Sequence, residues 1–161
     1  MELSIKKLRN RIDRYFKENH KYAPSSLMFD MVDDDYIYLI IETHYVLRIP
    51  KSEVVDIIPV DKVDNIKVEP MIERIAEDKK LRDFRMGEVE QLRKDLKVVN
   101  FWDEDNNRVS INLKFFKQYI NHNPVDNGVP SNIEFSGIDG VNPLIMWEDG
   151  EAVAMFLPIM R

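Results

Sequence analysis

The first 50 residues carry one helical pattern followed by three strand patterns. Over residues 3–21 apolar side chains recur every three or four positions without Gly or Pro, which predicts an amphipathic helix that ends at residues 23–25. Residues 27–32, 36–42 and 45–49 are rich in β-branched and aromatic side chains and are separated by gaps of hairpin length. A three-stranded meander packed on the helix is the simplest assembly.

The last third of the chain repeats this plan. Residues 98–102 and 108–111 have strand patterns, Asn112 is suited to cap a helix over residues 113–121, and residues 124–128 form a turn cluster. Residues 133–136, 144–147 and 152–157 then alternate or run apolar, which predicts a second three-stranded meander. A helix followed by three strands is therefore expected twice.

The middle of the chain has a mixed pattern. Residues 50–69 favour strands and loop, because Pro50 and Pro59 interrupt runs of β-branched residues. Residues 70–97 hold eight basic and seven acidic groups among apolar residues, which predicts a solvated helical segment that Gly87 divides. The expected fold is a single α+β domain over residues 1–161, with a first repeat (1–50), an insertion or connection (51–97) and a second repeat (98–161).

Composition limits the classes of protein to consider. With 161 residues, 44% of them hydrophobic, the chain can bury an adequate core without a metal or disulfide. The absence of Cys excludes disulfides, thiolate zinc sites, iron–sulfur clusters and a cysteine nucleophile, and it fits a cytoplasmic setting. No apolar run approaches the roughly 20 residues that cross a bilayer, so no membrane or export role is expected.

Charge is distributed unevenly along the chain. The formal net charge of −6 argues against nucleic-acid binding, but residues 1–21 hold seven basic and three acidic groups, a local charge of +4 that leaves −10 for the other residues. The two predicted helices carry six basic residues on their outward faces: Lys7, Arg11, Arg14, Lys21, Lys114 and Lys117. The four on the first helix fall within an arc of about 80° opposite its apolar stripe.

Motifs for catalysis are missing. No two of the three His residues have metal-ligand spacing within one element, and no phosphate loop, Gly-x-Ser-x-Gly motif or Walker Lys occurs. Asp103, Asp105 and Asn107 imitate the start of a calcium loop, but Gly and Glu are absent from its sixth and twelfth positions. Neighbouring aspartates at 33–35 cannot converge on two cations. We expect no enzyme activity, catalytic residue, metal or cofactor, and a hairpin turn at Asp103 and Asp105.

Two segments resemble a known family. Residues 109–120, Val-Ser-Ile-Asn-Leu-Lys-Phe-Phe-Lys-Gln-Tyr-Ile, resemble the strand-to-helix junction of bacterial sliding clamps, the beta subunit of DNA polymerase III. Residues 156–161, Phe-Leu-Pro-Ile-Met-Arg, are similar to the Met-Pro-Met-Arg-Leu tail of that family, with Leu157 in place of its first Met and no Leu after Arg161. The likeness is clearest over about the last 65 residues. Over residues 1–50 it is supported by the expected order of a helix and three strands and not by a motif.

The resemblance implies a DNA-clamp-like (processivity-fold) domain, several of which would form a ring around double-stranded DNA. The six basic residues would contact phosphates without reading bases, so binding would be non-specific and salt-dependent. A client peptide, from a polymerase or another protein, would bind at four residues of the C-terminal tail: Leu157, Pro158, Met160 and Arg161. Since this chain has material for one domain, a closed ring implies self-association of about six copies or a partner.

Three functional interpretations follow. The first is a non-enzymatic clamp-like protein that tethers other proteins to DNA in replication or repair. The second is a clamp-fold protein-interaction module that does not encircle DNA, such as one encoded by a phage or mobile element. A metal-dependent nuclease at Asp103 and Asp105 is disfavoured, because the pattern of carboxylates does not predict a converging site.

Overall fold

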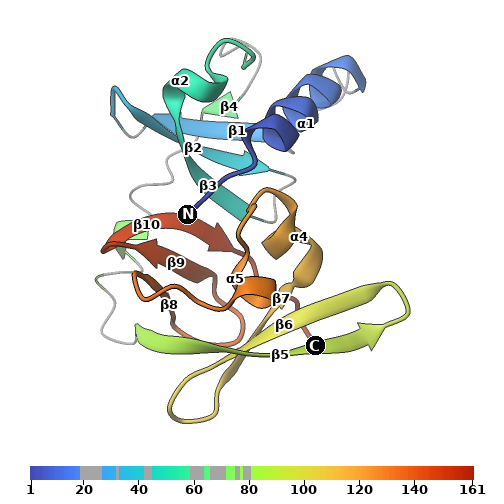
Figure 1. Ribbon diagram of the computed structural model, residues 1–161. Helices are drawn as coiled ribbons and strands as arrows, with labels where there is room; N and C mark the ends of the chain where they lie inside the picture. The colour runs from blue at the N-terminus through green and yellow to red at the C-terminus, as the bar shows by residue number, and fades with distance from the viewer. Residues whose placement is uncertain are drawn as a thin grey trace.

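A computed structural model describes residues 1–18, 27–31, 33–41, 45–58, 64–65, 72–74, 77 and 81–161. In these residues the protein has a mixed α+β fold in which short helices accompany a large, mostly antiparallel sheet (Figure 1). Among the described residues, no helix combines the length and apolar character that a membrane crossing requires.

The first repeat begins with α1 (Ile5–Glu18), followed by β1 (Leu27–Met31), β2 (Tyr36–Ile41) and β3 (Tyr45–Pro50). Successive strands pair antiparallel, so the predicted helix and meander are confirmed. The buried face of α1 consists of residues spaced by three or four positions, Leu8, Ile12 and Tyr15. The predicted end of the helix at residues 23–25 lies outside the described residues.

The segment after β3 is partly helical. Residues Lys51–Val54 form α2, a helical turn in the segment that was predicted as strands and loop, so that prediction is wrong for these residues. The turn directly follows Pro50 and buries Val54 completely. β4 (Asp64–Asn65) then pairs parallel with β1 at the edge of the sheet.

The predicted charged helix over residues 70–97 is wrong for its second half. Residues 72–74 and 77 are helical, but β5 (Arg82–Arg93) and β6 (Leu96–Trp102) form an antiparallel hairpin, and β6 also pairs with β7 (Arg108–Asn112). Along β5 the buried and half-buried side chains alternate with exposed ones, with Phe84, Met86 and Leu92 on the covered face. Glu88 and Glu90 lie on that same face and Val89 is exposed on the other, so the sequence hides the alternation that marks a half-buried strand.

Gly87, which was expected to divide a helix, lies instead at an irregularity in the pairing of β5 with β6. A Cβ at this position would lie 2.8 Å from Cδ1 of Trp102 and 3.2 Å from the carbonyl oxygen of Asn100. Gly87 therefore permits the indole ring to lie close against the backbone of β5.

The second repeat comprises α4 (Leu113–Gln118), α5 (Pro124–Asn127), β8 (Ile133–Gly137), β9 (Leu144–Glu148) and β10 (Glu151–Phe156). The three strands form the predicted antiparallel meander. The side chain of Asn112 accepts a hydrogen bond from the backbone N–H of Lys114 at 3.0 Å, which confirms the predicted cap. The helix itself is shorter than predicted, and the predicted turn cluster at 124–128 contains the short helix α5.

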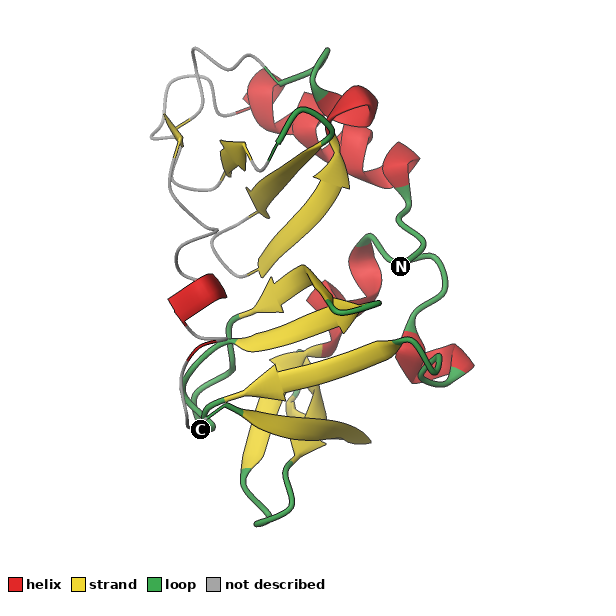
Figure 2. Ribbon diagram, turned by 90° about the vertical axis from the view of Figure 1, so that its left-hand side faces the viewer, coloured by secondary structure: helices red, strands yellow, loops and turns green. Residues whose placement is uncertain are grey.

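The two meanders join edge to edge, because β3 pairs antiparallel with β10. The order of the sheet, over the described strands, is β4-β1-β2-β3-β10-β9-β8-β5-β6-β7. β5 pairs with β8 through residues 82–84 and with β6 through most of its remaining length. Figure 2 shows the meander of the first repeat above that of the second.

Both α1 and α4 pack on the same face of this sheet. One buried cluster contains side chains from both helices together with alternate residues of the strands, such as Leu47 of β3 and Phe156 of β10. A smaller cluster on the opposite face contains the intervening residues, such as Val46 and Met155, and is covered in part by Ile72. The outward sides of the two helices therefore point away from one common face.

Candidate nucleic-acid interface

The basic face of α1 is only partly available to a partner. Lys7 and Arg14 are exposed, and within the described part of the chain neither has an ion pair. Arg11 is half-buried and interacts with other groups of the protein. Lys21, the fourth predicted member of this face, lies outside the described residues.

Other basic residues of α1 are paired within the molecule. Arg9 makes two hydrogen bonds of 2.9 and 3.0 Å to the carboxylate of Asp56, whose pKa these bonds hold below its usual range. Nζ of Lys17 lies 2.8 Å from Oδ2 of Asp13, one helical turn earlier. These contacts reduce the positive charge that α1 presents to solvent.

The two predicted lysines of α4 differ in their surroundings. Lys114 is exposed, whereas Nζ of Lys117 lies 2.9 Å from Oδ1 of Asp126 in α5. This contact, with a hydrogen bond from Asn123, lowers the pKa of Asp126. Because the Lys117 and Asp126 side chains are 36% and 55% exposed, water screens the pair and a polyanion could compete for the ammonium group.

Two further lysines, which the sequence reasoning missed, lie beside those of α4. Lys94 occupies the turn of the β5–β6 hairpin and Lys97 lies near the start of β6. They were missed because residues 70–97 were predicted to be helical. The only signal for a turn is the polar pair at 94–95 ahead of the apolar run at 98–102.

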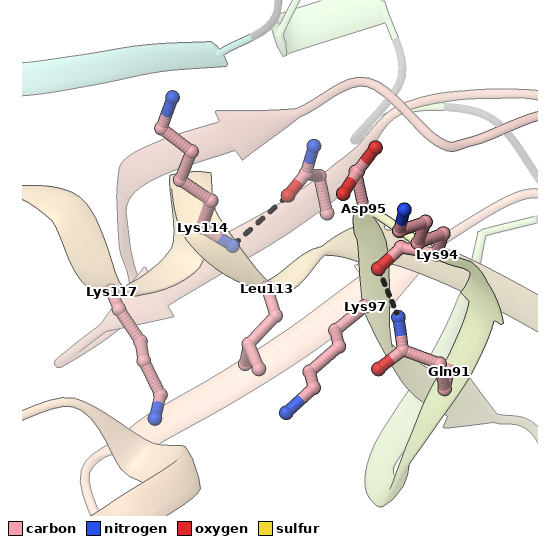
Figure 3. A pocket seen from close by; sticks show the side chains of 8 residues that line it. Gln91, Lys94, Asp95, Lys97, Leu113, Lys114 and Lys117 are labelled. Atoms are coloured by element: carbon pink, nitrogen blue, oxygen red, sulfur yellow. Dashed lines mark hydrogen bonds between the residues drawn. The ribbon is translucent and has the colours of Figure 1, made fainter.

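These lysines line a cleft with a volume of about 400 Å³, which we call the lysine cleft (Figure 3). Its walls come from the hairpin and from the β7–α4 junction, and its lining residues are Gln91, Lys94, Asp95, Lys97, Asn112, Leu113, Lys114 and Lys117. In Figure 3 the side chains of Lys97 and Lys117 extend in the same direction on either side of Leu113, and Lys114 extends the opposite way.

The N-terminal end of α1 is tied to the C-terminal end of α4. The backbone N–H of Ser4 donates to the carbonyl of Tyr119 at 2.6 Å, and that of Asn121 donates to the carbonyl of Glu2 at 2.9 Å. These bonds bring the two helices, which are over 90 residues apart in the sequence, next to one another (Figure 1). The exposed cations of α1 and those of the lysine cleft consequently belong to neighbouring elements.

The C-terminal tail lies against β7 and the hairpin. The backbone N–H of Ile159 donates to the carbonyl of Ser110 at 2.8 Å, while Leu157 and Met160 are 44% and 62% exposed and Pro158 is half-buried. Of the four predicted client-binding residues, the two large apolar side chains are therefore accessible.

Arg161, the fourth of those residues, is engaged within the protein. Its Nη2 lies 2.6 Å from the carboxylate of Glu90 and 3.0 Å from Oδ1 of the fully buried Asn100, and the guanidinium also donates to Oγ of Ser110. The hydrogen bond from Arg161 is the main reason that the pKa of Glu90 falls to about 2.

The aspartates that imitate a calcium loop stabilise a turn between β6 and β7, as predicted. The carboxylate of Asp103 accepts hydrogen bonds from the backbone N–H groups of Asp105 and Asn107 at 2.9 and 2.8 Å and from the Asn107 amide. Arg82 forms ion pairs with both Asp103 and Asp105. In the part of the chain that the structure describes, no three His, Asp or Glu side chains are arranged to hold a metal ion.

Comparisons of the chain with family models, curated proteins and solved structures gave no match. The candidate function therefore depends on the charge and geometry of the residues above.

Proposed function

We propose that this protein is a non-enzymatic, DNA-clamp-like tethering protein, which binds double-stranded DNA through its phosphates and holds a client through its C-terminal tail. One observation carries the proposal: two helix-plus-meander repeats share one sheet through β3 and β10, with both helices on the same face. This arrangement supports a common binding surface that includes Lys7, Arg14 and Lys114, each of which is exposed.

Phosphate contacts of this kind explain how an acidic protein could bind DNA without reading its sequence. Each cation that neutralises a phosphate releases a condensed counterion, so the logarithm of the binding constant falls with the logarithm of salt concentration by about 0.9 per contact. Three such contacts would give a slope of about −3 and weak binding by a single copy. A stable tether then needs several copies or a partner, with Leu157 and Met160 left accessible for a client.

The test is binding to labelled DNA duplexes of two unrelated sequences, measured by fluorescence anisotropy over a series of salt concentrations. The double variant Lys7→Glu/Arg14→Glu should bind both duplexes about tenfold more weakly or worse, with a salt slope reduced by about two. The matched control is Arg74→Glu/Arg85→Glu, which alters net charge equally at exposed residues outside α1 and α4.

Two results would count against the proposal. If the Arg74→Glu/Arg85→Glu control weakens DNA binding as much as the Lys7→Glu/Arg14→Glu variant does, the loss of affinity reflects net charge and not a binding face. If the unaltered protein does not retain either duplex at the lowest salt concentration, DNA tethering is excluded.

The second candidate is a protein-interaction module without a DNA function. Its support is that Arg9, Lys17, Lys117 and Arg161 all pair with carboxylates of their own chain. Light scattering with and without duplex DNA separates the two candidates. A monomer whose molar mass does not change when DNA is added favours the module, whereas an oligomer that gains the mass of the duplex favours the tether.

A further inference from the structure

The tip of the β5–β6 hairpin is a defined structure that projects from the body of the protein (Figure 1). The amide of Gln91 donates to the carbonyl of Lys94 at 3.3 Å and also to the carbonyl of Arg93, so one side chain bridges the backbone of the turn. The lysines near the tip are thereby presented at a fixed place beside α4.

The lysine cleft gathers like charges at a concave surface. Lys94 and Lys97 on the hairpin side and Lys114 and Lys117 on the α4 side line a volume of about 400 Å³, together with a single acidic residue, Asp95. Repulsion among clustered ammonium groups is unfavourable in the free protein, even where water screens it. A bound polyanion would relieve that repulsion.

The chemistry of the lining favours a polynucleotide backbone over other anions. Its charged groups are mostly ammonium groups, which suit diffuse contacts to successive phosphates and do not form the planar fork that grips one carboxylate. The lining contains no aromatic side chain on which a base could stack, so base recognition is not supported.

We propose that the lysine cleft binds the sugar–phosphate backbone of the same DNA that contacts α1, with the hairpin as an outer wall. The proposal rests on the proposed function and extends its contact surface by Lys94 and Lys97. On binding, Lys117 exchanges its partner Asp126 for a phosphate oxygen.

The test is the double variant Lys94→Glu/Lys97→Glu of the full chain, assayed with the same duplexes. Affinity should fall about tenfold or more and the salt slope should decrease by about two, while Lys94→Arg/Lys97→Arg should retain the affinity of the unaltered protein. The control Arg74→Glu/Arg85→Glu introduces the same charge change elsewhere. Because Lys94 and Lys97 are exposed, the thermal midpoint should not change, which shows that lost binding is not lost folding.

The outcomes separate this inference from the proposed function. If the Lys94→Glu/Lys97→Glu variant binds DNA normally while the Lys7→Glu/Arg14→Glu variant binds more weakly, the cleft proposal is wrong and the proposed DNA-tethering function stands. If the Lys94→Glu/Lys97→Glu variant binds DNA more weakly and the Lys7→Glu/Arg14→Glu variant does not, the cleft binds DNA without α1, and the surface that it is proposed to share with α1 is wrong. Displacement of DNA by inorganic phosphate at concentrations too low to change ionic strength would assign the cleft to a small anion and overturn the inference.

Discussion

Phe156 is the residue whose removal best tests how the two repeats are held together. It lies on β10 directly opposite Tyr45 of β3, at the strand pair that joins the meanders. Its ring centroid is 6.4 Å from that of Tyr45 and 5.2 Å from that of Phe116 in α4, and its exposure is 1%. One side chain thus contacts the first meander and the second helix.

Replacing Phe156 by Ala should lower the free energy of unfolding by about 3–5 kcal/mol, the range for a fully buried Phe that leaves a cavity. With a urea dependence of about 2 kcal/mol per molar, the unfolding midpoint should fall by about 2 M. The adjacent control, Leu157→Ala, removes a side chain that is 44% exposed, so its effect should stay within about 0.5 kcal/mol.

The assay is urea denaturation followed by circular dichroism and tryptophan fluorescence, extended to a double-mutant cycle with Tyr45→Ala. The two aromatic residues should show a coupling energy of about 0.5–1.5 kcal/mol. A loss below about 1 kcal/mol for Phe156→Ala would refute the packing at the β3–β10 junction. Two separate transitions in the unaltered protein would refute the cooperative joining of the repeats.

Two further predictions concern a close backbone contact and an ion pair. Gly140→Ala should destabilise the protein by about 1–3 kcal/mol in the same urea assay, because the new Cβ would lie 2.7 Å from the carbonyl oxygen of Arg108; a neutral result would show that this approach is not tight. Glu90→Gln should lower the unfolding midpoint at pH 7. The pKa of Glu90 is depressed from 4.5 to about 2, so its stabilising effect is present above pH 4.5 and is lost as the pH falls toward 2. The difference in midpoint between the variant and the unaltered protein should shrink over that window, and a constant difference would mean that the Glu90 carboxylate is not stabilised by Arg161.

The engagement of Arg161 also affects how the tail could serve a client. Its contacts with Glu90, Asn100 and Ser110 hold the end of the tail on the outer strands, while Leu157 and Met160 remain exposed. A client that binds these apolar side chains therefore need not break the ion pair. A client that recognises the guanidinium would have to compete with Glu90.

Most regular elements could be predicted because their signals are local. The buried face of α1 repeats at helical spacing through Leu8, Ile12 and Tyr15, and the strands of both meanders are short apolar runs with turn residues between them. The cap at Asn112 is also local, since donor and acceptor are two residues apart. The α+β class and the doubled helix-plus-meander plan therefore follow from the order of residues alone.

The hairpin and the pairing of charges were decided only by the tertiary structure. The sequence did not reveal β5 because Glu88 and Glu90 lie on its covered face and Val89 is exposed on the other, so only the pairing with β6 and β8 shows that it is a strand. Lys117 meets Asp126 nine positions away, and Arg161 meets Glu90 at a separation of 71. The periodicity of the sequence shows which side of a helix or strand is buried. It does not show which cations stay exposed or which ones line the lysine cleft. That depends on the path of the whole chain, because electrostatic contacts form between residues that are far apart in the sequence.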